Sequence, residues 1–465
     1  MGLPPGPRTP GIYNTLSYSV RPRATNARWH RKYGDVFTVT FAGFGRGVAI
    51  ADPHAIRELF TGDQSDLLAG DANGFLTPIL GKHSLLTLDG PEHLRQRRLL
   101  SPPFQGSRVT GFRDVVRNAA NREIDSWRPG SEIVLRDHMR HLTFEVICRA
   151  VFGVTERERI EPLRDALVAL VDASKFLIGP AIVRKDLGRL SPGGRFQRTL
   201  RAADKLLYEE IERRRGEPDL EDRNDVLSLL MCARDDEGNA MSDVELRDEL
   251  VTLLGAGHET TATSLAFGIE LLLHHPGELS ALRAAIAEDG GEKRLEAVMR
   301  ETMRVKPVID AVERTLTKPR RVGAWELPAG AMIFPSIMLV HKRPDLYEDP
   351  GAFRPQRYLD AEPESYGWLP FGGGIRRCIG AALAQAEFIE ALRVIVMRTE
   401  LEALAARPDP IVLRGVTLVP KHGVRVRVKS VQPFEQVLDD ARGRAPDQVA
   451  VDGVGGGLER DPLAH

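Results

Sequence analysis

The sequence predicts a mainly α-helical protein with smaller β-sheets, an α+β fold. Apolar residues spaced three and four apart, which is typical of amphipathic helices, recur over most of the 465 residues. One long apolar segment, 243–275, predicts a single helix that crosses the interior. Strand patterns are confined to the two ends of the chain and do not alternate with helices, which argues against a parallel α/β sheet.

Residues 1–30 are taken as a Pro-rich lead-in, and prolines at positions 4, 5, 7 and 10 predict that its start is stiff and extended. Residues 33–52 alternate between apolar and polar types with glycine breaks, which predicts a hairpin. Further strand patterns occur at 324–336 and 423–431. Between the strand patterns, helical spacing is found in six main segments, 52–60, 91–100, 117–127, 141–153, 161–172 and 199–215.

The expected domain organisation is one catalytic domain over residues 31–430. Beyond it, residues 431–465 lose apolar density and gain glycine and charge, which predicts a flexible tail. No period of fixed length repeats along the chain, so a repeat architecture is excluded.

The overall composition is that of an ordinary globular protein, with 42% hydrophobic and 28% charged residues and a formal net charge of −1. This charge balance gives no reason to expect nucleic acid as a partner. No apolar run reaches the ~18 residues of a membrane span, so no span is expected. We expect a cytoplasmic protein and a monomer. Three scattered cysteines, Cys148, Cys232 and Cys378, are too few for a disulfide framework.

The long helix has a clear start and stop. Ser242 followed by Glu245 forms the pattern of a capping box, and Pro276 marks the end. Between residues 250 and 273 the only charged residues are Glu259 and Glu270. A helix that is apolar nearly all round is expected to be buried.

The segment GAGHETT, residues 255–261, lies in the middle of this helix. A dinucleotide-binding loop is excluded because Thr260 stands where a third glycine is needed, and a zinc-protease helix because Ala262 replaces the second histidine. A structural helix that tolerates two glycines remains possible, at about 1 kcal/mol for each glycine. The alternative is that the glycines loosen the helix and open a groove for a small ligand, beside a carboxyl and a hydroxyl that deliver protons.

Glu301 and Arg304 are one helical turn apart and can form an ion pair, although most such pairs are exposed and contribute little. Arg357 lies between prolines and aromatic residues, an unusual position for a merely solvated arginine. A buried cluster of the three residues is therefore possible, and the spacing alone does not decide it.

The segment FGGGIRRCIG, residues 371–380, places Cys378 behind a run of glycines. A lone cysteine is most often a small core residue. Glycines at 372–374 would permit backbone N–H groups to face a thiolate, and Gly380 would let the following helix approach a flat cofactor. Arg376 could reach an anionic edge of that cofactor. The arrangement is suited to a haem thiolate.

Taken together, these residues resemble the cytochrome P450 family, with the likeness extending over about residues 33–428 and looking closest to the soluble bacterial members. Four family motifs occur in order: Ala256-Gly257-x-Glu259-Thr260-Thr261, Glu301-x-x-Arg304, Phe353-x-Pro355-x-Arg357, and Phe371-x-x-Gly374-x-Arg376-x-Cys378-x-Gly380.

The resemblance implies a cytochrome P450 fold, with haem b between the long central helix and the helix that follows the cysteine loop. Cys378 would be the axial thiolate ligand of the iron, in the loop bounded by Phe371 and Gly380. The haem propionates would be held by four basic residues, His93, Arg97, Arg314 and Arg376.

The resemblance also assigns roles away from the propionates. Thr260 and Glu259 would deliver protons to bound dioxygen, with Ala256 and Gly257 lining the groove where it binds. The ion cluster of Glu301, Arg304 and Arg357 would fix the cysteine loop.

The activity implied is that of a monooxygenase that uses O₂ and two electrons from a separate ferredoxin or flavodoxin with its reductase. Arg95, Arg98 and Arg377 are either a docking patch for that partner or solvated charges. The segments 75–80, 176–181 and 308–312 match pocket-lining regions of the family and are mostly apolar, so a lipophilic small-molecule substrate is expected.

Two other functions stay open. One is a haem-thiolate isomerase or a peroxygenase, against which the pair Glu259 and Thr260 argues. The other is a non-enzymatic haem-binding or gas-binding sensor with the tail as its output.

Overall fold

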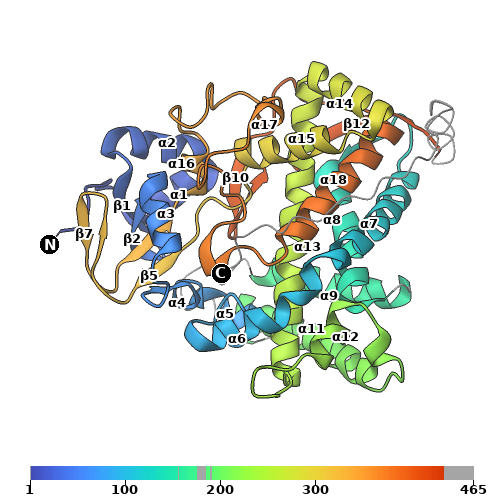
Figure 1. The fold of residues 1–465 in the computed structure, drawn as a ribbon, viewed down its shortest axis with the longest axis horizontal. Helices are drawn as coiled ribbons and strands as arrows, with labels where there is room; N and C mark the ends of the chain where they lie inside the picture. The colour runs from blue at the N-terminus through green and yellow to red at the C-terminus, as the bar shows by residue number, and fades with distance from the viewer. Residues whose placement is uncertain (1, 155–156, 175–184, 189–190, 434–465) are drawn as a thin grey trace, which may run out of the picture.

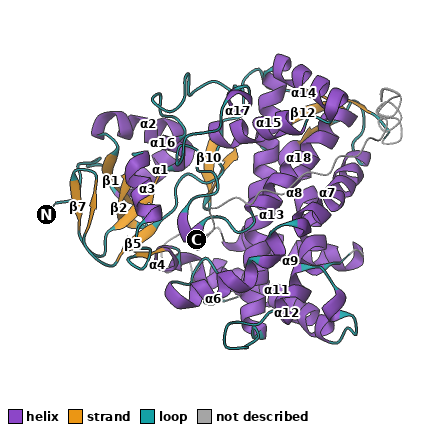
Figure 2. Cartoon of the chain, in the orientation of Figure 1, coloured by secondary structure: helices purple, strands orange, loops and turns teal. Residues whose placement is uncertain are grey.

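The computed structural model describes residues 2–154, 157–174, 185–188 and 191–433. A large helical region and a smaller region rich in strands lie side by side (Figures 1 and 2). The helices are α1 (Gly11–Val20), α2 (Pro22–Tyr33), α3 (Pro53–Thr61), α4 (Ala69–Ala72), α5 (Thr77–Leu80), α6 (Gly90–Leu100), α7 (Ser107–Asp125), α8 (Leu135–Phe152), α9 (Arg157–Ser174), α11 (Pro192–Arg215), α12 (Val226–Cys232), α13 (Asp243–His274), α14 (Pro276–Asp289), α15 (Glu292–Val305), α16 (Ile337–Val340), α17 (Arg357–Asp360) and α18 (Ala381–Arg398).

The strands form four small sheets. The largest has the order β1-β2-β8-β5-β3, a second has the order β4-β12-β9, and β6–β7 and β10–β11 are hairpins. Their bounds are β1 (Val36–Phe41), β2 (Gly45–Ile50), β3 (Leu67–Leu68), β4 (Glu132–Val134), β5 (Arg314–Leu316), β6 (Arg320–Val322), β7 (Trp325–Leu327), β8 (Met332–Pro335), β9 (Thr399–Ala403), β10 (Ile411–Arg414), β11 (Thr417–Pro420) and β12 (Arg425–Val431).

The predicted hairpin is confirmed, since β1 and β2 pair antiparallel from Val36 opposite Ile50 to Phe41 opposite Gly45. Strand β2 also pairs in parallel with β8, so the beginning of the chain and the predicted strand near residue 333 share one sheet. The predicted strand at the other end of the domain is β12. The mainly α, minor β class is therefore confirmed.

Residues 2–10, which contain the four prolines of the expected extended segment, lack helix. Helices α1 and α2 follow, separated by Arg21. Pro10 and Pro22 stand at the N-cap and at the first position of a helix, where a fixed φ and a missing N–H favour helix initiation. Pro10 and Pro22 therefore start two helices, of which α1 packs on β1 and β10.

Helix α13 confirms the predicted long helix. Its capping box is present: the Ser242 hydroxyl accepts from the backbone N–H of Glu245, and the Glu245 carboxylate accepts from the N–H of Ser242 at 2.7 Å. The helix is continuous through Gly255 and Gly257, which agrees with the alternative of an intact helix that tolerates both glycines.

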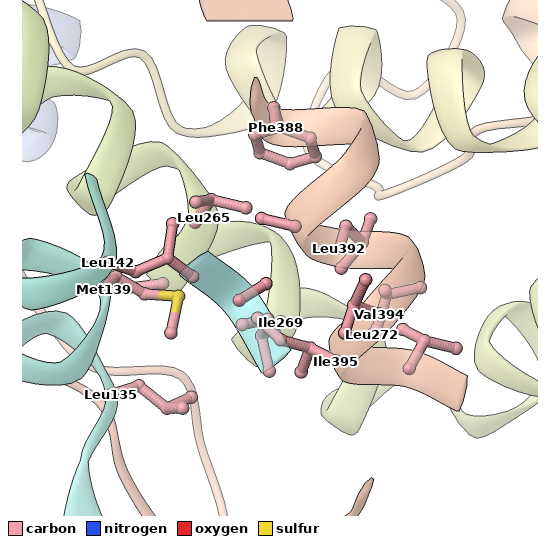
Figure 3. Close-up of a cluster of buried hydrophobic side chains, with 14 of the residues drawn as sticks. Leu135, Met139, Leu142, Leu265, Ile269, Leu272, Phe388, Leu392, Val394 and Ile395 are labelled. Carbon is pink, nitrogen blue, oxygen red and sulfur yellow. The ribbon is translucent and has the colours of Figure 1, made fainter. Parts of the chain in front are cut away.

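Helix α13 forms the centre of one apolar core with α8 and α18, as Figure 3 shows. Gly268 of α13 makes the contact with α18 possible, because a Cβ there would lie 2.7 Å from a ring carbon of Phe388. The residues that meet in this core include Leu135, Met139 and Leu142 of α8, Leu265, Ile269 and Leu272 of α13, and Phe388, Leu392, Val394 and Ile395 of α18. This packing fixes α18, which begins three residues after Cys378, against the central helix.

Among the described helices, none combines the length and the apolar character that crossing a bilayer would require.

Candidate active site around the Cys378 loop

The loop that carries Cys378 is a tight turn closed by its own backbone. The N–H of Cys378 donates to the carbonyl of Phe371 at 2.9 Å. Gly372 and Gly374 adopt φ of +67° and +64°, a region that favours glycine. A Cβ at Gly373 would lie 2.5 Å from the ring of Phe60. The glycine run is therefore required by the turn and by the close contact with α3.

The sulfur of Cys378 is in an environment with opposing effects. Burial raises the pKa of the thiol, whereas a backbone hydrogen bond from Gly380 and the charges of Arg377 and Arg97 lower it. Cys378 can be reached by solvent, yet enough of the protein surrounds its sulfur for burial to raise the pKa of the thiol. Cys148, by contrast, is buried in the core, where burial raises its pKa strongly.

Gly380 differs from the glycines at 372–374, because neither the turn nor protein packing requires a glycine there. A Cβ at this position would meet no protein atom within 4 Å. Protein packing therefore does not explain the small residue, and the position leaves room for a flat group against the start of α18. The backbone N–H that favours the thiolate is that of Gly380.

The four basic residues predicted to hold propionates are brought together. His93 is 1% exposed, and neither ring nitrogen has a hydrogen-bond partner. Burial, together with the charges of Arg376, Arg97 and Arg314, lowers the pKa of His93 to about 3. Nε of Arg314 is likewise buried without a partner. Cations that converge with unsatisfied donors need anions, and two carboxylates of a haem meet this requirement.

Besides Arg314, which donates to the carbonyl of its neighbour Glu313, two of these cations bind more distant segments of the protein. Arg376 donates to the carbonyls of Leu85 and Leu88 and pairs with Asp89 at 2.6 Å. Arg97 donates to the carbonyl of Arg377 at 2.7 Å, which ties α6 to the cysteine loop. Both residues therefore also hold protein segments in place around the cluster.

The segment 255–260 is the exposed part of an otherwise buried stretch of α13. Residues 246–254 and 261–272 are buried, whereas Ala256 is exposed and Gly255, Gly257, Glu259 and Thr260 are partly exposed. The hydroxyl of Thr260 donates to the carbonyl of Ala256 at 2.7 Å. Space for a ligand is thus provided by small side chains on an intact helix.

The carboxylate of Glu259 is held by two arginines of α8. Arg136 donates a hydrogen bond to it, and Nε of Arg140 lies 3.0 Å from its second oxygen. The sequence motif located Glu259 but gave no sign of these partners, which lie about 120 residues earlier in the chain.

Glu301, Arg304 and Arg357 form the ion cluster that the sequence left undecided. Glu301 and Arg304 are completely buried, and two hydrogen bonds of 2.7 and 2.8 Å join them. Arg357 donates to the same carboxylate at 3.1 Å. Arg304 also donates, at 2.9 Å each, to the carbonyls of His341, Pro350 and Ala352. All five N–H donors of its guanidinium are thus used.

His341 connects this cluster to the cysteine loop and was missed by the sequence analysis. Its carbonyl accepts from Arg304, and its Nε2 accepts from the N–H of Leu369 at 2.7 Å. Leu369 lies two residues before Phe371, where the loop begins. Burial, with the charges of Arg304 and Lys342, lowers the pKa of His341 to about 3, so the ring is neutral and can accept. No spacing or motif in the sequence indicates this contact.

The three arginines considered for partner docking differ from one another. Arg95 is paired with Asp235 and Glu245 at 2.6 Å each, and Arg98 with Asp236. Arg95 is half-buried in these pairs, whereas Arg98 and Asp236 form an exposed pair, which leaves Arg98 a largely solvated charge. Arg377 is exposed and next to Cys378.

The pocket-lining segments are described only in part. Segment 75–80 lies in and before α5, which contacts α13, and segment 308–312 precedes β5. Segment 176–181 lies outside the described residues. Asp310, an acid within an otherwise apolar segment, accepts hydrogen bonds from Tyr18 of α1 and Asn26 of α2. The helical start of the chain is thereby tied to this segment.

Replacing Arg304 with alanine is expected to destabilise the protein by about 3–5 kcal/mol, because the Glu301 carboxylate would remain buried without its main partner. Denaturant unfolding of the purified protein would measure the loss. The matched control is Arg300→Ala, one turn earlier, whose pairs with Glu296 and Glu362 are partly exposed and should contribute less than about 1 kcal/mol. Equal losses in both variants would contradict the special role of the cluster.

Replacing Lys342 with methionine is expected to stabilise the protein at pH 7. Burial, together with the charges of Arg23 and Arg304, lowers the pKa of Lys342 to about 6. Between this pH and its ordinary pKa, the unfolded chain binds a proton that the folded chain does not, so the native lysine costs stability. The advantage of Lys342→Met should be largest near pH 6 and shrink towards pH 10 in urea unfolding. An advantage that grows with pH would refute the assignment.

Comparison with known proteins agrees with this geometry. The family model for cytochrome P450 matches residues 4–426. A Mycobacterium tuberculosis protein named cytochrome P450 135B1 is 39% identical over 441 residues, covering 93% of this chain and 92% of its own. Another from the same organism, named cytochrome P450 138, is 37% identical over 425 residues, covering 91% and 96%.

Solved structures show the same fold. The haem domain of cytochrome P450DA aligns with a TM-score of 0.83 at 23% identity, over 94% of this chain and 99% of its own. Retinoic acid-bound cyanobacterial CYP120A1 aligns with a TM-score of 0.80 at 24% identity, over 93% and 100%. Members of the matched family bind haem b through an axial cysteine thiolate, and the residues around Cys378 fit that group. The chain therefore belongs to the cytochrome P450 family.

Proposed function

We propose that the protein is a haem-dependent monooxygenase that inserts one atom of O₂ into a lipophilic small molecule, with two electrons from a separate redox partner. The observation that carries this proposal is the interruption in the burial of helix α13 at residues 255–260, where Ala256 is exposed and Glu259 and Thr260 are partly exposed. This segment presents a small residue, Ala256, beside a hydroxyl, Thr260, and a carboxylate, Glu259. A protein that only held haem would have no need of this combination.

Haem bound here would supply the activation of O₂. Cys378 would be its axial ligand, with the Gly380 N–H and the nearby arginine charges favouring the thiolate. His93, Arg97, Arg314 and Arg376 would hold the propionates. The three arginines would balance the charge of two carboxylates that are taken out of water, and the neutral ring of His93 would donate a hydrogen bond.

Thr260 and Glu259 would move protons. The Thr260 hydroxyl donates to the Ala256 carbonyl, which leaves its oxygen lone pairs able to accept a proton donor such as water. Glu259 is joined to Arg136 and Arg140, so it can carry protons from solvent only by releasing at least one of these arginines. The arginine pair would thus determine how often the carboxylate is free.

The redox partner would be a ferredoxin or flavodoxin with its reductase. It would dock near the cysteine loop, where Arg377 is exposed. Arg95 and Arg98 would serve mainly to hold α6 against residues 235–245.

The decisive experiment is NADPH-dependent oxygen consumption by the haem-loaded protein with a supplied ferredoxin, its reductase and a library of lipophilic compounds. Oxygenated product that depends on electron supply supports the proposal. Rearrangement of a hydroperoxide without electrons would indicate an isomerase or peroxygenase, and ligand binding without turnover under every donor would indicate a sensor.

Replacing Cys378 with serine is expected to abolish the thiolate signature in the carbon monoxide difference spectrum of the reduced protein, because a hydroxyl does not replace a thiolate as ligand. Cys232→Ser, at the exposed end of α12, is the matched control and should leave the spectrum unchanged. An unchanged spectrum for Cys378→Ser would refute the ligand assignment.

Replacing Thr260 with alanine is expected to reduce product formed per NADPH by up to about 100-fold, the low end of the effect of a positioned acid–base group. Electrons would instead leave as hydrogen peroxide, which a peroxidase-coupled assay measures. Thr260→Ser keeps the hydroxyl and should retain most of the coupling. If both variants behave like the unmodified enzyme, Thr260 is not part of the proton path.

A further inference from the structure

Helix α1 exposes its apolar side chains and buries its polar ones. Ile12, Leu16 and Val20 lie on successive turns, 60%, 59% and 58% exposed, and Tyr13 beside them is 51% exposed. At 100° per residue, all four lie within an arc of about 100°. A surface helix of a globular protein normally has the opposite arrangement.

The polar residues of α1 are used inside the protein. Asn14 is fully buried and donates to the carbonyl of Thr40 at 3.0 Å. Ser17 is hydrogen-bonded to Thr25 at 3.0 Å, and the hydroxyl of Tyr18 donates to Asp310. These contacts fix the rotation of the helix about its own axis, so its apolar face cannot turn inward.

The apolar face is also not the result of a frayed end. Helix α1 packs on β1, β10 and α2, and the rings of Tyr18 and Trp29 stack with centroids 6.3 Å apart. In Figure 1, α1 and α2 lie together over the sheet region. The exposed face is therefore held rigidly at the surface.

The segment that contains α1 and α2 carries an excess of positive charge. Residues 2–34 contain six Lys and Arg residues and no Asp or Glu, whereas the whole chain has 64 basic and 65 acidic residues. In the part of the chain that the structure describes, no ion pair involves the five most exposed of them. These five are Arg8, Arg21, Arg28, Arg31 and Lys32. Charge asymmetry of this kind attracts an anionic surface.

We propose that α1 and the start of α2 dock the enzyme on an anionic lipid surface, with Ile12, Leu16 and Val20 inserted among the acyl chains and the cations on the headgroups. A short helix with an aliphatic face and flanking cations is the pattern of an interfacial helix. A nucleic acid would use the cations but would leave the aliphatic residues exposed. An acidic protein would likewise complement the charges more than the aliphatic face.

The test is co-sedimentation of the haem-loaded protein with phosphatidylcholine vesicles, with and without phosphatidylglycerol. Binding to the anionic vesicles should be at least about tenfold tighter, since each Lys or Arg near such a surface contributes a factor of about five. It should weaken when salt shortens the Debye length from about 30 Å to about 3 Å. No turnover is needed, so the result is independent of the proposed reaction.

Two sets of variants separate the apolar and the electrostatic contributions. Replacing both Ile12 and Leu16 with serine should weaken binding by about tenfold or more. The matched control, Val244→Ser with Leu359→Ser, changes exposed apolar residues elsewhere and should not weaken binding.

Charge reversal of Arg21, Arg28 and Arg31 to Glu should weaken binding by about 100-fold. Reversal of Arg128, Arg195 and Arg201, which are exposed on other elements, should weaken it much less. Haem content and the carbon monoxide spectrum would confirm folding of each variant.

The proposal is overturned if the unmodified protein does not sediment with anionic vesicles at low salt. It is also overturned if the control sets weaken binding as much as the α1 and α2 sets. Binding to an acidic electron-transfer protein or to DNA that needs the same arginines, without vesicle binding, would assign this surface to that other partner.

Discussion

The buried pair of Glu301 and Arg304 is the constraint on which the active site depends. Burying a carboxylate and a guanidinium away from water costs free energy, and this cost is offset only if hydrogen bonds satisfy every donor and acceptor. Arg304 meets this condition by binding three backbone carbonyls in addition to Glu301. Because those carbonyls belong to the segment that leads to the cysteine loop, satisfying the arginine also determines the path of the chain.

His341 carries this constraint to the loop. Its carbonyl accepts a hydrogen bond from Arg304, and its neutral ring accepts one from the backbone N–H of Leu369. From Leu369 the chain enters the turn that the Phe371–Cys378 hydrogen bond closes. The position of the sulfur is therefore linked to a charge pair on α15 by direct hydrogen bonds and a short length of rigid backbone.

On α13 and around His93, in contrast to the ion cluster, the protein does not satisfy its own polar groups or cover its helix. Here the protein leaves groups unsatisfied: both nitrogens of His93 and Nε of Arg314 are buried without partners, and Ala256 is exposed within a buried helix. Such features cost free energy in the protein alone and are compensated only by a ligand with an apolar body and anionic edges. The tight ion cluster and the unsatisfied basic cluster thus differ in kind: the hydrogen bonds of the first are satisfied within the protein, whereas the second has buried polar groups that a bound cofactor would satisfy.

The sequence by itself determined what depends on local spacing. The long helix, its capping box and the mainly α class follow from periodicity and from residues at most four apart, and the first hairpin from one short turn between neighbouring strands, because helix and hairpin contacts are local in sequence. The four motifs also placed Cys378, Glu301, Arg304 and the 255–260 segment in order along the chain.

Only the tertiary structure decided which distant groups meet. The partners of Glu259 on α8, the link through His341, the pairing of Arg95 with Asp235 and the outward rotation of α1 involve residues far apart in sequence, and no local pattern encodes them. The sequence analysis assigned no helix to residues 11–33, because proline content alone does not show that Pro10 and Pro22 stand at helix starts, where proline stabilises a helix once packing holds it. Distance along the chain carries no information about such contacts, because they are set by how the helices and sheets pack against one another.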